Sequence, residues 1–98
     1  MAANYVTHKF DGKLTKEELQ KHFDSWQGSA RVRYGHRYDN GAISEARGLT
    51  IDDMVCQGWK EADNYLHPKV HKRGPAVAIR LQEPGQPECW FIGAICAA

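Results

Sequence analysis

The sequence predicts a single small α+β domain: an antiparallel sheet of four to five strands with two helices packed on one face. Its 98 residues are enough for one domain spanning positions 1–98. Two segments have apolar residues at helical spacing, and several short segments alternate between apolar and polar residues. The connections between them are of hairpin length, which favours antiparallel pairing.

The first two elements are a strand and a helix. Asn4 to Phe10 alternates and ends at the turn Asp11-Gly12. Thr15-Lys16-Glu17-Glu18 forms a capping box, and Leu19, Phe23 and Trp26 then recur on one helical face. Gly28 is placed to end this helix, so the helix is expected over residues 15–27.

A strand rich in arginine is predicted next. Ala30 to Tyr38 places apolar and aromatic residues on one face and Arg31, Arg33 and Arg37 on the other. Asn40-Gly41 predicts a tight hairpin turn. The return strand is expected over residues 42–49, although Ala42 to Arg47 would also serve as a short helix.

A second helix is expected from Thr50, where Thr50-Ile51-Asp52-Asp53 resembles the first capping box. Val55, Trp59, Ala62 and Leu66 continue it as an apolar stripe, and Pro68 ends it.

Two more strands complete the chain. Residues 75–81 alternate, whereas Cys89 to Cys96 is apolar on both faces and is typical of a central, doubly covered strand. The resulting order, β-α-β-β-α-β-β, is similar to a ferredoxin-like unit with an extra strand.

Composition limits the classes of function. The net charge of +1 argues against a polybasic nucleic-acid binder and against an acidic mimic of DNA. Three widely spaced cysteines argue against a disulfide framework and for a reducing, cytoplasmic location. The N-terminal residues lack the apolar region of a secretory signal, and no apolar run is long enough for a membrane span.

No catalytic residue, metal site or cofactor is predicted. Asp11 to Glu18 resembles half of a calcium loop, but a lysine would fall among the ligands. His67 and His71 have the spacing of two metal ligands, but Pro68 interrupts the helix that would align them. The cysteines lie in apolar settings typical of packing, so an enzyme with a Cys–His pair is the weakest alternative.

The basic residues are the candidate partner-binding residues. They are the three strand arginines and the loop that follows the second helix: Arg31, Arg33, Arg37, Lys69, His71, Lys72 and Arg73. Arginines on an exposed face suit a carboxylate-rich host protein. The alternative is single-stranded nucleic acid, which strand-borne arginines and tyrosines could bind. The three tryptophans are expected in the core, and any left exposed would be a candidate interface anchor.

The C-terminal half resembles small uncharacterised phage and prophage proteins. The matching residues are Ala62 and Tyr65, then His71-Lys72-Arg73-Gly74-Pro75-Ala76, then Trp90-Phe91-Ile92-Gly93. The resemblance implies an origin in a phage or mobile element and carries over no functional residue. With the absence of a catalytic motif, it indicates a non-enzymatic inhibitor that occludes a host defence or replication protein.

Overall fold

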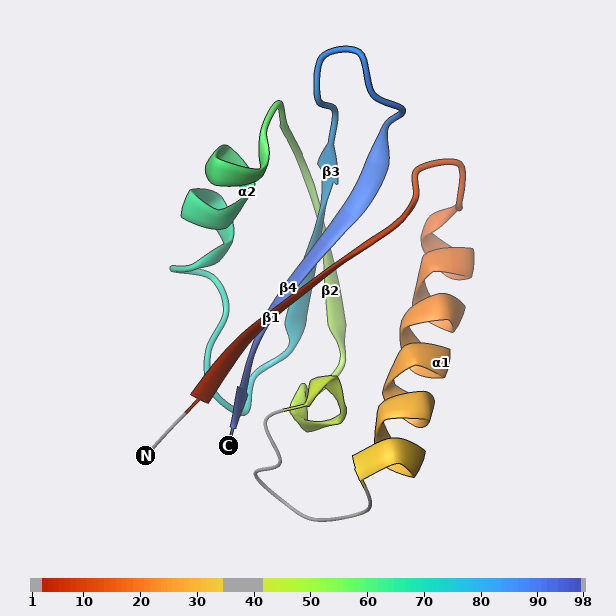
Figure 1. Cartoon of the computed structure of the whole chain (residues 1–98), viewed down its shortest axis with the longest axis vertical. Coiled ribbons are helices and arrows are strands. Elements are labelled where there is room, and N and C mark those ends of the chain that lie inside the picture. The colour runs from red at the N-terminus through yellow and green to blue at the C-terminus, as the bar shows by residue number, and fades with distance from the viewer. Residues whose placement is uncertain (1–2, 35–41, 98) are drawn as a thin grey trace.

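In the computed structural model, which describes residues 3–34 and 42–97, two helices pack on a four-stranded sheet (Figure 1). The α+β class is therefore confirmed. In chain order the elements are β1 (Ala3–Asp11), α1 (Lys16–Tyr34), the short 3₁₀ helix η1 (Ile43–Glu45), β2 (Leu49–Cys56), α2 (Trp59–Leu66), β3 (Ala76–Leu81) and β4 (Cys89–Ala97).

The sheet is mixed, so the expectation of a purely antiparallel sheet is corrected. Its strand order is β1-β4-β3-β2. β4 is antiparallel to both neighbours, and its register with β1 runs without interruption from Ala3↔Ala97 to Asp11↔Cys89. β2 and β3 are parallel because α2 connects them as a crossover, which returns the chain to its starting end.

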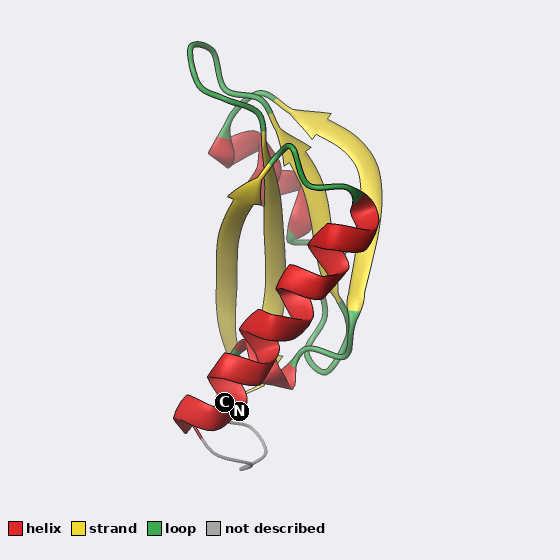
Figure 2. Ribbon diagram, turned by 90° about the vertical axis from the view of Figure 1, so that its right-hand side faces the viewer, coloured by secondary structure: helices red, strands yellow, loops and turns green. Residues whose placement is uncertain are grey.

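The two helices lie on opposite faces of the sheet, not on one face as the sequence suggested (Figures 1 and 2). The path from β1 to β2 crosses the whole sheet in one direction, and the path from β2 to β3 moves back. Both paths join parallel strands, and crossovers of this kind have the same, right-handed sense. Two connections of the same hand that run in opposite directions put their helices on opposite faces.

Each face has its own core. On the α1 face, Leu19 and Phe23 pack against Trp90, Ile92 and other buried residues of β3 and β4. On the α2 face, Ala62 and Leu66 pack against a set that includes Phe91. The apolar β4 is therefore central and covered on both sides, as its sequence predicted.

α1 is longer than expected and includes part of the predicted arginine strand. It continues through residues 30–34, so the strand prediction is wrong there. The physical reason is that the apolar spacing does not stop at Trp26: buried Ala30 follows four residues later on the same face. Gly28 lies inside the helix and does not end it. The rest of that strand and the Asn40-Gly41 turn lie outside the described residues.

The region predicted as a return strand and a long second helix also differs. Ile43–Glu45 is a 3₁₀ turn, in keeping with the helical alternative, and Leu49–Cys56 is a strand. Because Ile51 packs in the α1 core and Met54 in the α2 core, this strand uses both faces, with a register shift between Ile51 and Val55. The capping box at Thr50 is therefore wrong, and α2 begins after the extended Gly58.

Candidate functional site

The candidate arginines lie on a helix and not on a strand. Arg31 and Arg33 are exposed in the last turn of α1. Two residues on an α-helix are about 200° apart, so these side chains do not share one flat face. Arg37 lies outside the described residues. The stacking surface that favoured single-stranded nucleic acid is therefore not formed by residues 30–34.

The predicted basic loop follows α2. The Leu66 carbonyl accepts from the N–H groups of Lys69 and Val70 at 2.8 and 3.0 Å, and the Lys69 Nζ lies 4.6 Å from the centre of the Tyr65 ring. Arg73 adopts a φ of 64°, a left-handed conformation that L-residues rarely take.

Hydrogen bonds join the loop and the end of α1 through η1. The Gln27 side chain donates to the carbonyls of Ile43 and Ala46 at 3.1 and 2.8 Å, which fixes η1 against α1. The Arg47 N–H donates to the Gly74 carbonyl at 2.9 Å, which fixes the loop against the residues after η1. The end of α1 and η1 lie at the lower end of Figure 1, and the loop descends to that end from α2 at mid-height.

We call this end of the molecule the basic end, because seven basic side chains belong to its segments. They are Arg31, Arg33, Arg47, Lys69, His71, Lys72 and Arg73. Arg47 was not a sequence candidate, because only the long-range bond to Gly74 brings it there. Within the described residues, no ion pair uses Arg31, Arg33, Arg47, Lys69 or Lys72.

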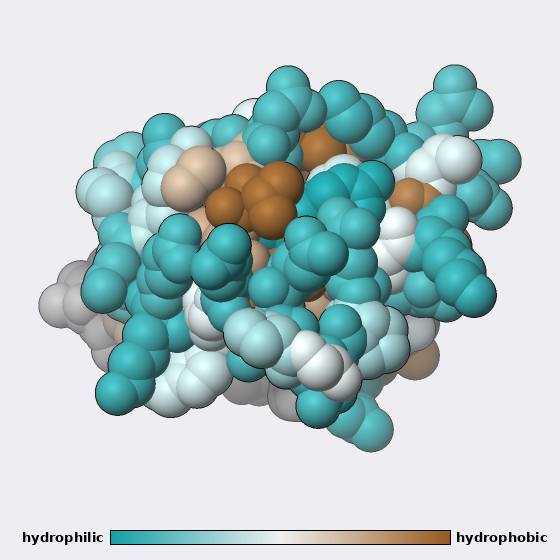
Figure 3. All heavy atoms as spheres, turned by 90° about the horizontal axis from the view of Figure 1, so that it is seen from above, coloured by the Kyte–Doolittle hydropathy of each residue, from teal (hydrophilic) through white to brown (hydrophobic). Residues whose placement is uncertain are grey.

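The opposite, upper end is formed by residues 11–15, the start of α2 and the loop of residues 82–88 (Figure 1). Viewed from above, it is mostly hydrophilic around a small apolar area (Figure 3). Three ion pairs form in this part of the molecule: Lys9 with Glu83 at 3.3 Å, Lys16 with Asp53 at 3.1 Å, and Arg80 with Glu88 at 3.1 Å. Lys13 and Lys60, also at this end, are in no ion pair with the described residues.

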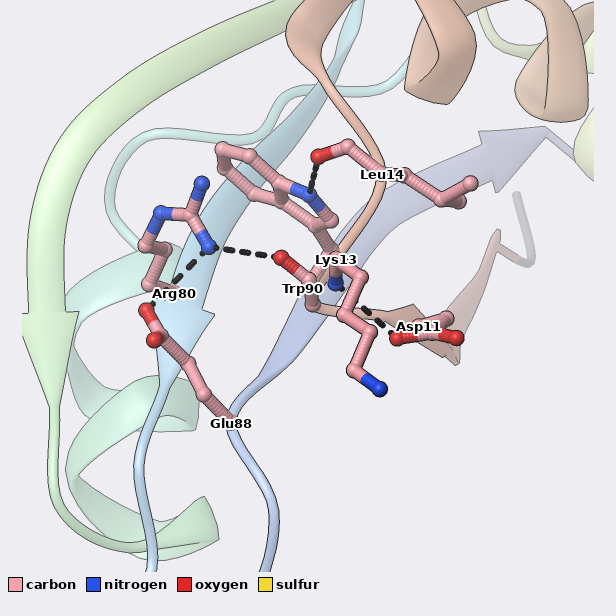
Figure 4. A network of polar contacts seen from close by, with 7 residues as sticks. Asp11, Lys13, Leu14, Arg80, Glu88 and Trp90 are labelled. Atoms are coloured by element: carbon pink, nitrogen blue, oxygen red, sulfur yellow. Dashed lines mark hydrogen bonds and ion pairs between the residues drawn. The ribbon is translucent and has the colours of Figure 1, made fainter.

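Arg80 is the centre of a structural network at the upper end (Figure 4). Its guanidinium lies 3.9 Å from the centre of the Trp90 ring and donates to the Gly12 carbonyl at 3.1 Å. The Trp90 Nε1–H donates to the Leu14 carbonyl at 3.0 Å. These contacts fix the β1–α1 turn to β3 and β4. Arg80 therefore has a structural role, in contrast to the arginines of the basic end.

The predicted capping box begins α1 at the upper end. The Thr15 N–H donates to Glu18 Oε1 at 2.9 Å, and the Glu18 N–H donates to Thr15 Oγ1 at 3.2 Å. The backbone N–H of Thr15, followed by its side-chain hydroxyl, lowers the pKa of the Glu18 carboxyl.

An exposed apolar residue lies between the two arginines of α1. Val32 is 88% exposed. A shallow groove of about 590 Å³ runs beside it along the helix, lined by Ser25, Gly28, Ser29, Val32 and Arg33. The sequence interpretation missed this surface, since it placed Val32 on the buried face of a strand.

A deeper hollow lies on the other side of Arg33. It has a volume of about 490 Å³ and lies between β1, α1 and η1, with Val6, Trp26, Ala30 and Ile43 in its wall. Arg33 thus borders both hollows, and it is the only charged residue among the described residues that line either of them.

The tryptophans differ in exposure. Trp90 is buried, Trp26 is half-buried, and Trp59 at the start of α2 is 53% exposed. Trp59 therefore meets the condition for an interface anchor, but it belongs to the upper end and is remote in the fold from the basic end.

The cysteine thiols are poor nucleophiles in this fold. Burial raises the pKa of Cys56 and of Cys89, and it raises the pKa of Cys96 to about 11. Only the thiolate is strongly nucleophilic, so a raised pKa lowers reactivity at neutral pH. Among the described residues, no group of three His, Cys, Asp or Glu side chains could hold a metal ion.

Comparisons with known proteins give no family for this chain: no family model, no curated protein and no solved structure matches it. In the described part of the chain, no helix is both long and apolar enough to cross a membrane.

Proposed function

We propose that this protein is a cytoplasmic, non-enzymatic binding protein whose basic end docks on an acidic surface of a protein partner. The contact surface is the last two turns of α1, with Val32 at its centre and with Arg31 and Arg33 flanking it on opposite sides of the helix. The candidate loop residues Lys69, His71, Lys72 and Arg73 extend the same end on the other side of η1.

The distribution of charge supports binding through the basic end. The chain as a whole is almost neutral, yet seven of its basic residues belong to the segments of one end, where η1 adds the acidic Glu45. Five of the seven have no ion pair within the described residues. Such a local field attracts an acidic surface and speeds encounter with it.

The observation that carries the proposal is Val32, 88% exposed between two arginines. An apolar side chain with arginines beside it is typical of the centre of a protein interface, where arginine is enriched. It offers nothing to a phosphate backbone. This feature favours a protein partner over a nucleic acid.

The kind of partner is proposed from the resemblance of the C-terminal half to phage and prophage proteins. We therefore infer an inhibitor that occludes a host defence or replication protein.

The experiment is affinity capture of the tagged protein from bacterial lysate, with and without nuclease, followed by mass spectrometry. Three variants accompany the wild type: Arg33→Glu and Val32→Asp in the proposed surface, and Lys21→Glu on an exposed earlier turn of the same helix as the matched control. An acidic protein in stoichiometric amount should survive nuclease treatment and persist with Lys21→Glu. Reversing Arg33 should weaken its binding by about 2–5 kcal/mol if the arginine pairs with a desolvated carboxylate.

Other results would reject the proposal. Loss of all retained material on nuclease treatment would assign the basic end to nucleic acid. A partner retained equally by all three variants would remove the end of α1 from consideration. Retention of nothing would reject a stable protein partner.

A further inference from the structure

We propose that the free edge of β1 pairs with β1 of a second copy, antiparallel and centred on Thr7, to give a symmetric dimer with one continuous eight-stranded sheet. β1 and β2 form the two opposite edges of the sheet, and this inference concerns the β1 edge. It goes beyond the proposed function.

β1 is a long edge strand with a regular backbone. It pairs only with β4, and no other described segment lies beyond its free edge (Figure 2). The pairing with β4 covers nine consecutive positions without a bulge, and the strand contains neither proline nor glycine. Sheet edges of this kind bind further strands unless charge, proline, bulges or a covering element prevent it.

β1 carries one lysine, Lys9, which forms an ion pair with Glu83, and it has no bulge. The other edge strand, β2, is protected more strongly. Its register shifts between Ile51 and Val55, and two acidic residues, Asp52 and Asp53, lie at that shift. Irregular backbone and charge at an edge oppose the addition of another strand. The contrast identifies β1 as the margin that can accept one.

The sequence of β1 is complementary to itself in the antiparallel direction. Centring the pair on Thr7, the middle of Ala3–Asp11, sets Thr7 opposite Thr7 of the second copy. Lys9 then faces Tyr5, and Asp11 faces Ala3, so no like charges lie directly opposite. Parallel pairing in register would instead bring the two Lys9 residues, and the two Asp11 residues, together.

The distribution of charge over the molecule favours the same direction. β1 begins at the basic end and finishes at the upper end, where the ion pairs of Lys9 with Glu83 and of Arg80 with Glu88 balance positive and negative charge. Antiparallel pairing brings the basic end of each copy beside the upper end of the other. Parallel pairing would place the two basic ends together, where they repel.

A second copy is therefore the occupant that this edge fits best. A symmetric contact of this kind uses the same surface on both copies and closes after two, so it forms a dimer and not a fibre.

The test uses the expected contact between Thr7 of one copy and Thr7 of the second copy. Opposite residues of antiparallel strands have Cα atoms about 4.5–5.5 Å apart, which is within disulfide range. Under mild oxidation, Thr7→Cys should form a covalent dimer on a non-reducing gel. The matched control is Thr50→Cys, an exposed threonine on the other edge strand, which should stay monomeric. Burial keeps the native thiols Cys56 and Cys96 out of the cross-link, and the half-buried Cys89 is replaced by serine in both variants.

Sedimentation velocity of the unmodified protein gives an independent readout. At micromolar concentration we expect twice the 11.1 kDa mass of the chain. The N–H groups of successive residues in β1 point alternately toward β4 and toward the free edge. Either Thr7→Pro or His8→Pro therefore removes an N–H group that points toward the free edge. The variant that keeps its circular dichroism spectrum should be monomeric.

The proposal is overturned if the unmodified protein sediments as a monomer, or if Thr50→Cys cross-links as readily as Thr7→Cys. It is also overturned if a folded proline variant still sediments as a dimer. These outcomes do not depend on the partner at the basic end, so they are separate from failure of the capture experiment.

Discussion

The same substitution, glycine to alanine, should have opposite effects on stability at positions 12 and 28. Gly12 lies in the β1–α1 turn and Gly28 lies in the interior of α1. The comparison tests two features of the fold that the sequence did not indicate, the close approach of the turn to β4 and the continuation of α1 beyond residue 27.

At Gly12, a Cβ would have no room. It would lie 2.2 Å from the Glu88 carbonyl oxygen and 2.6 Å from the carbonyl carbon, both backbone atoms that cannot turn aside. The turn would have to move away from β4, which costs about 1–3 kcal/mol for overpacking. The move would also strain the hydrogen bond from Arg80 to the Gly12 carbonyl, at about 1 kcal/mol. We expect Gly12→Ala to lower the free energy of unfolding by about 2–4 kcal/mol.

At Gly28, a Cβ would meet nothing within 4 Å. In a helix interior, alanine is more favourable than glycine by about 1 kcal/mol. We therefore expect Gly28→Ala to raise the free energy of unfolding by about that amount. Had Gly28 ended the helix in a left-handed conformation, alanine there would destabilise the fold.

The assay is thermal and urea unfolding followed by circular dichroism. For a domain of this size, 1 kcal/mol shifts the Tm by roughly 4–8 °C, so the two variants should move in opposite directions by clearly measurable amounts. A Gly12→Ala protein as stable as the wild type would refute the close approach to Glu88. A Gly28→Ala protein less stable than the wild type would refute the helical path of residues 28–34.

Three further predictions concern titratable groups. Burial and a 2.9 Å hydrogen bond to Asp63 raise the pKa of the Tyr5 phenol above its ordinary value of 10.0. The difference in phenolate absorbance between the wild type and Tyr5→Phe reports the ionisation of Tyr5, and this difference should develop only above pH 10. A difference that appears near pH 10 would contradict the hydrogen bond to Asp63. The Tyr65 hydroxyl lowers the pKa of Asp52 below 3.8, so this pair stabilises the fold above that pH and the stabilisation is lost as the pH falls through the lower, folded value. In urea unfolding, the free energy of unfolding of Tyr65→Phe should fall less between pH 3.8 and lower pH than that of the wild type. An equal fall in both proteins would exclude the hydrogen bond between Tyr65 and Asp52. Burial raises the pKa of Cys96 to about 11, so its alkylation by iodoacetamide at neutral pH should be slow until the chain unfolds; fast labelling would restore the Cys–His enzyme as a candidate.

The elements that the sequence predicted well are those with local signals. The capping box of Thr15 and Glu18 begins α1 through bonds between residues three apart. The run from Cys89 to Cys96 is apolar on both faces because both faces are covered. Neither signal depends on what the rest of the chain does.

The errors arose where two periodicities overlap. Residues 30–34 alternate, but Ala30 also continues the helical stripe of Leu19, Phe23 and Trp26, and packing of that stripe on the sheet decides the outcome. In β2, Thr50 resembles a helix N-cap although it is also β-branched and suited to a strand. Both interpretations satisfy local rules, and only the parallel pairing of β2 with β3 distinguishes them.

That second error also hid the candidate site. With residues 50–56 taken as the start of the second helix, no parallel pair exists, and nothing requires the helices to lie on opposite faces. With β2 in place, two crossovers follow, and the short link from β2 to η1 sets Arg47 against Gly74. The basic end is thus a product of topology, assembled from segments separated in the chain.

The two proposals together fix the geometry of a complex. Antiparallel pairing through β1 would place the basic ends of the two copies at opposite ends of the joined sheet, because β1 begins at the basic end in each. One compact partner could not reach both ends, so each dimer should bind two partner molecules independently. The stoichiometry of the captured complex would then be one partner per chain. A proline variant that stays folded as a monomer should bind one partner with unchanged affinity, and a lower affinity would show that the second copy completes the binding surface.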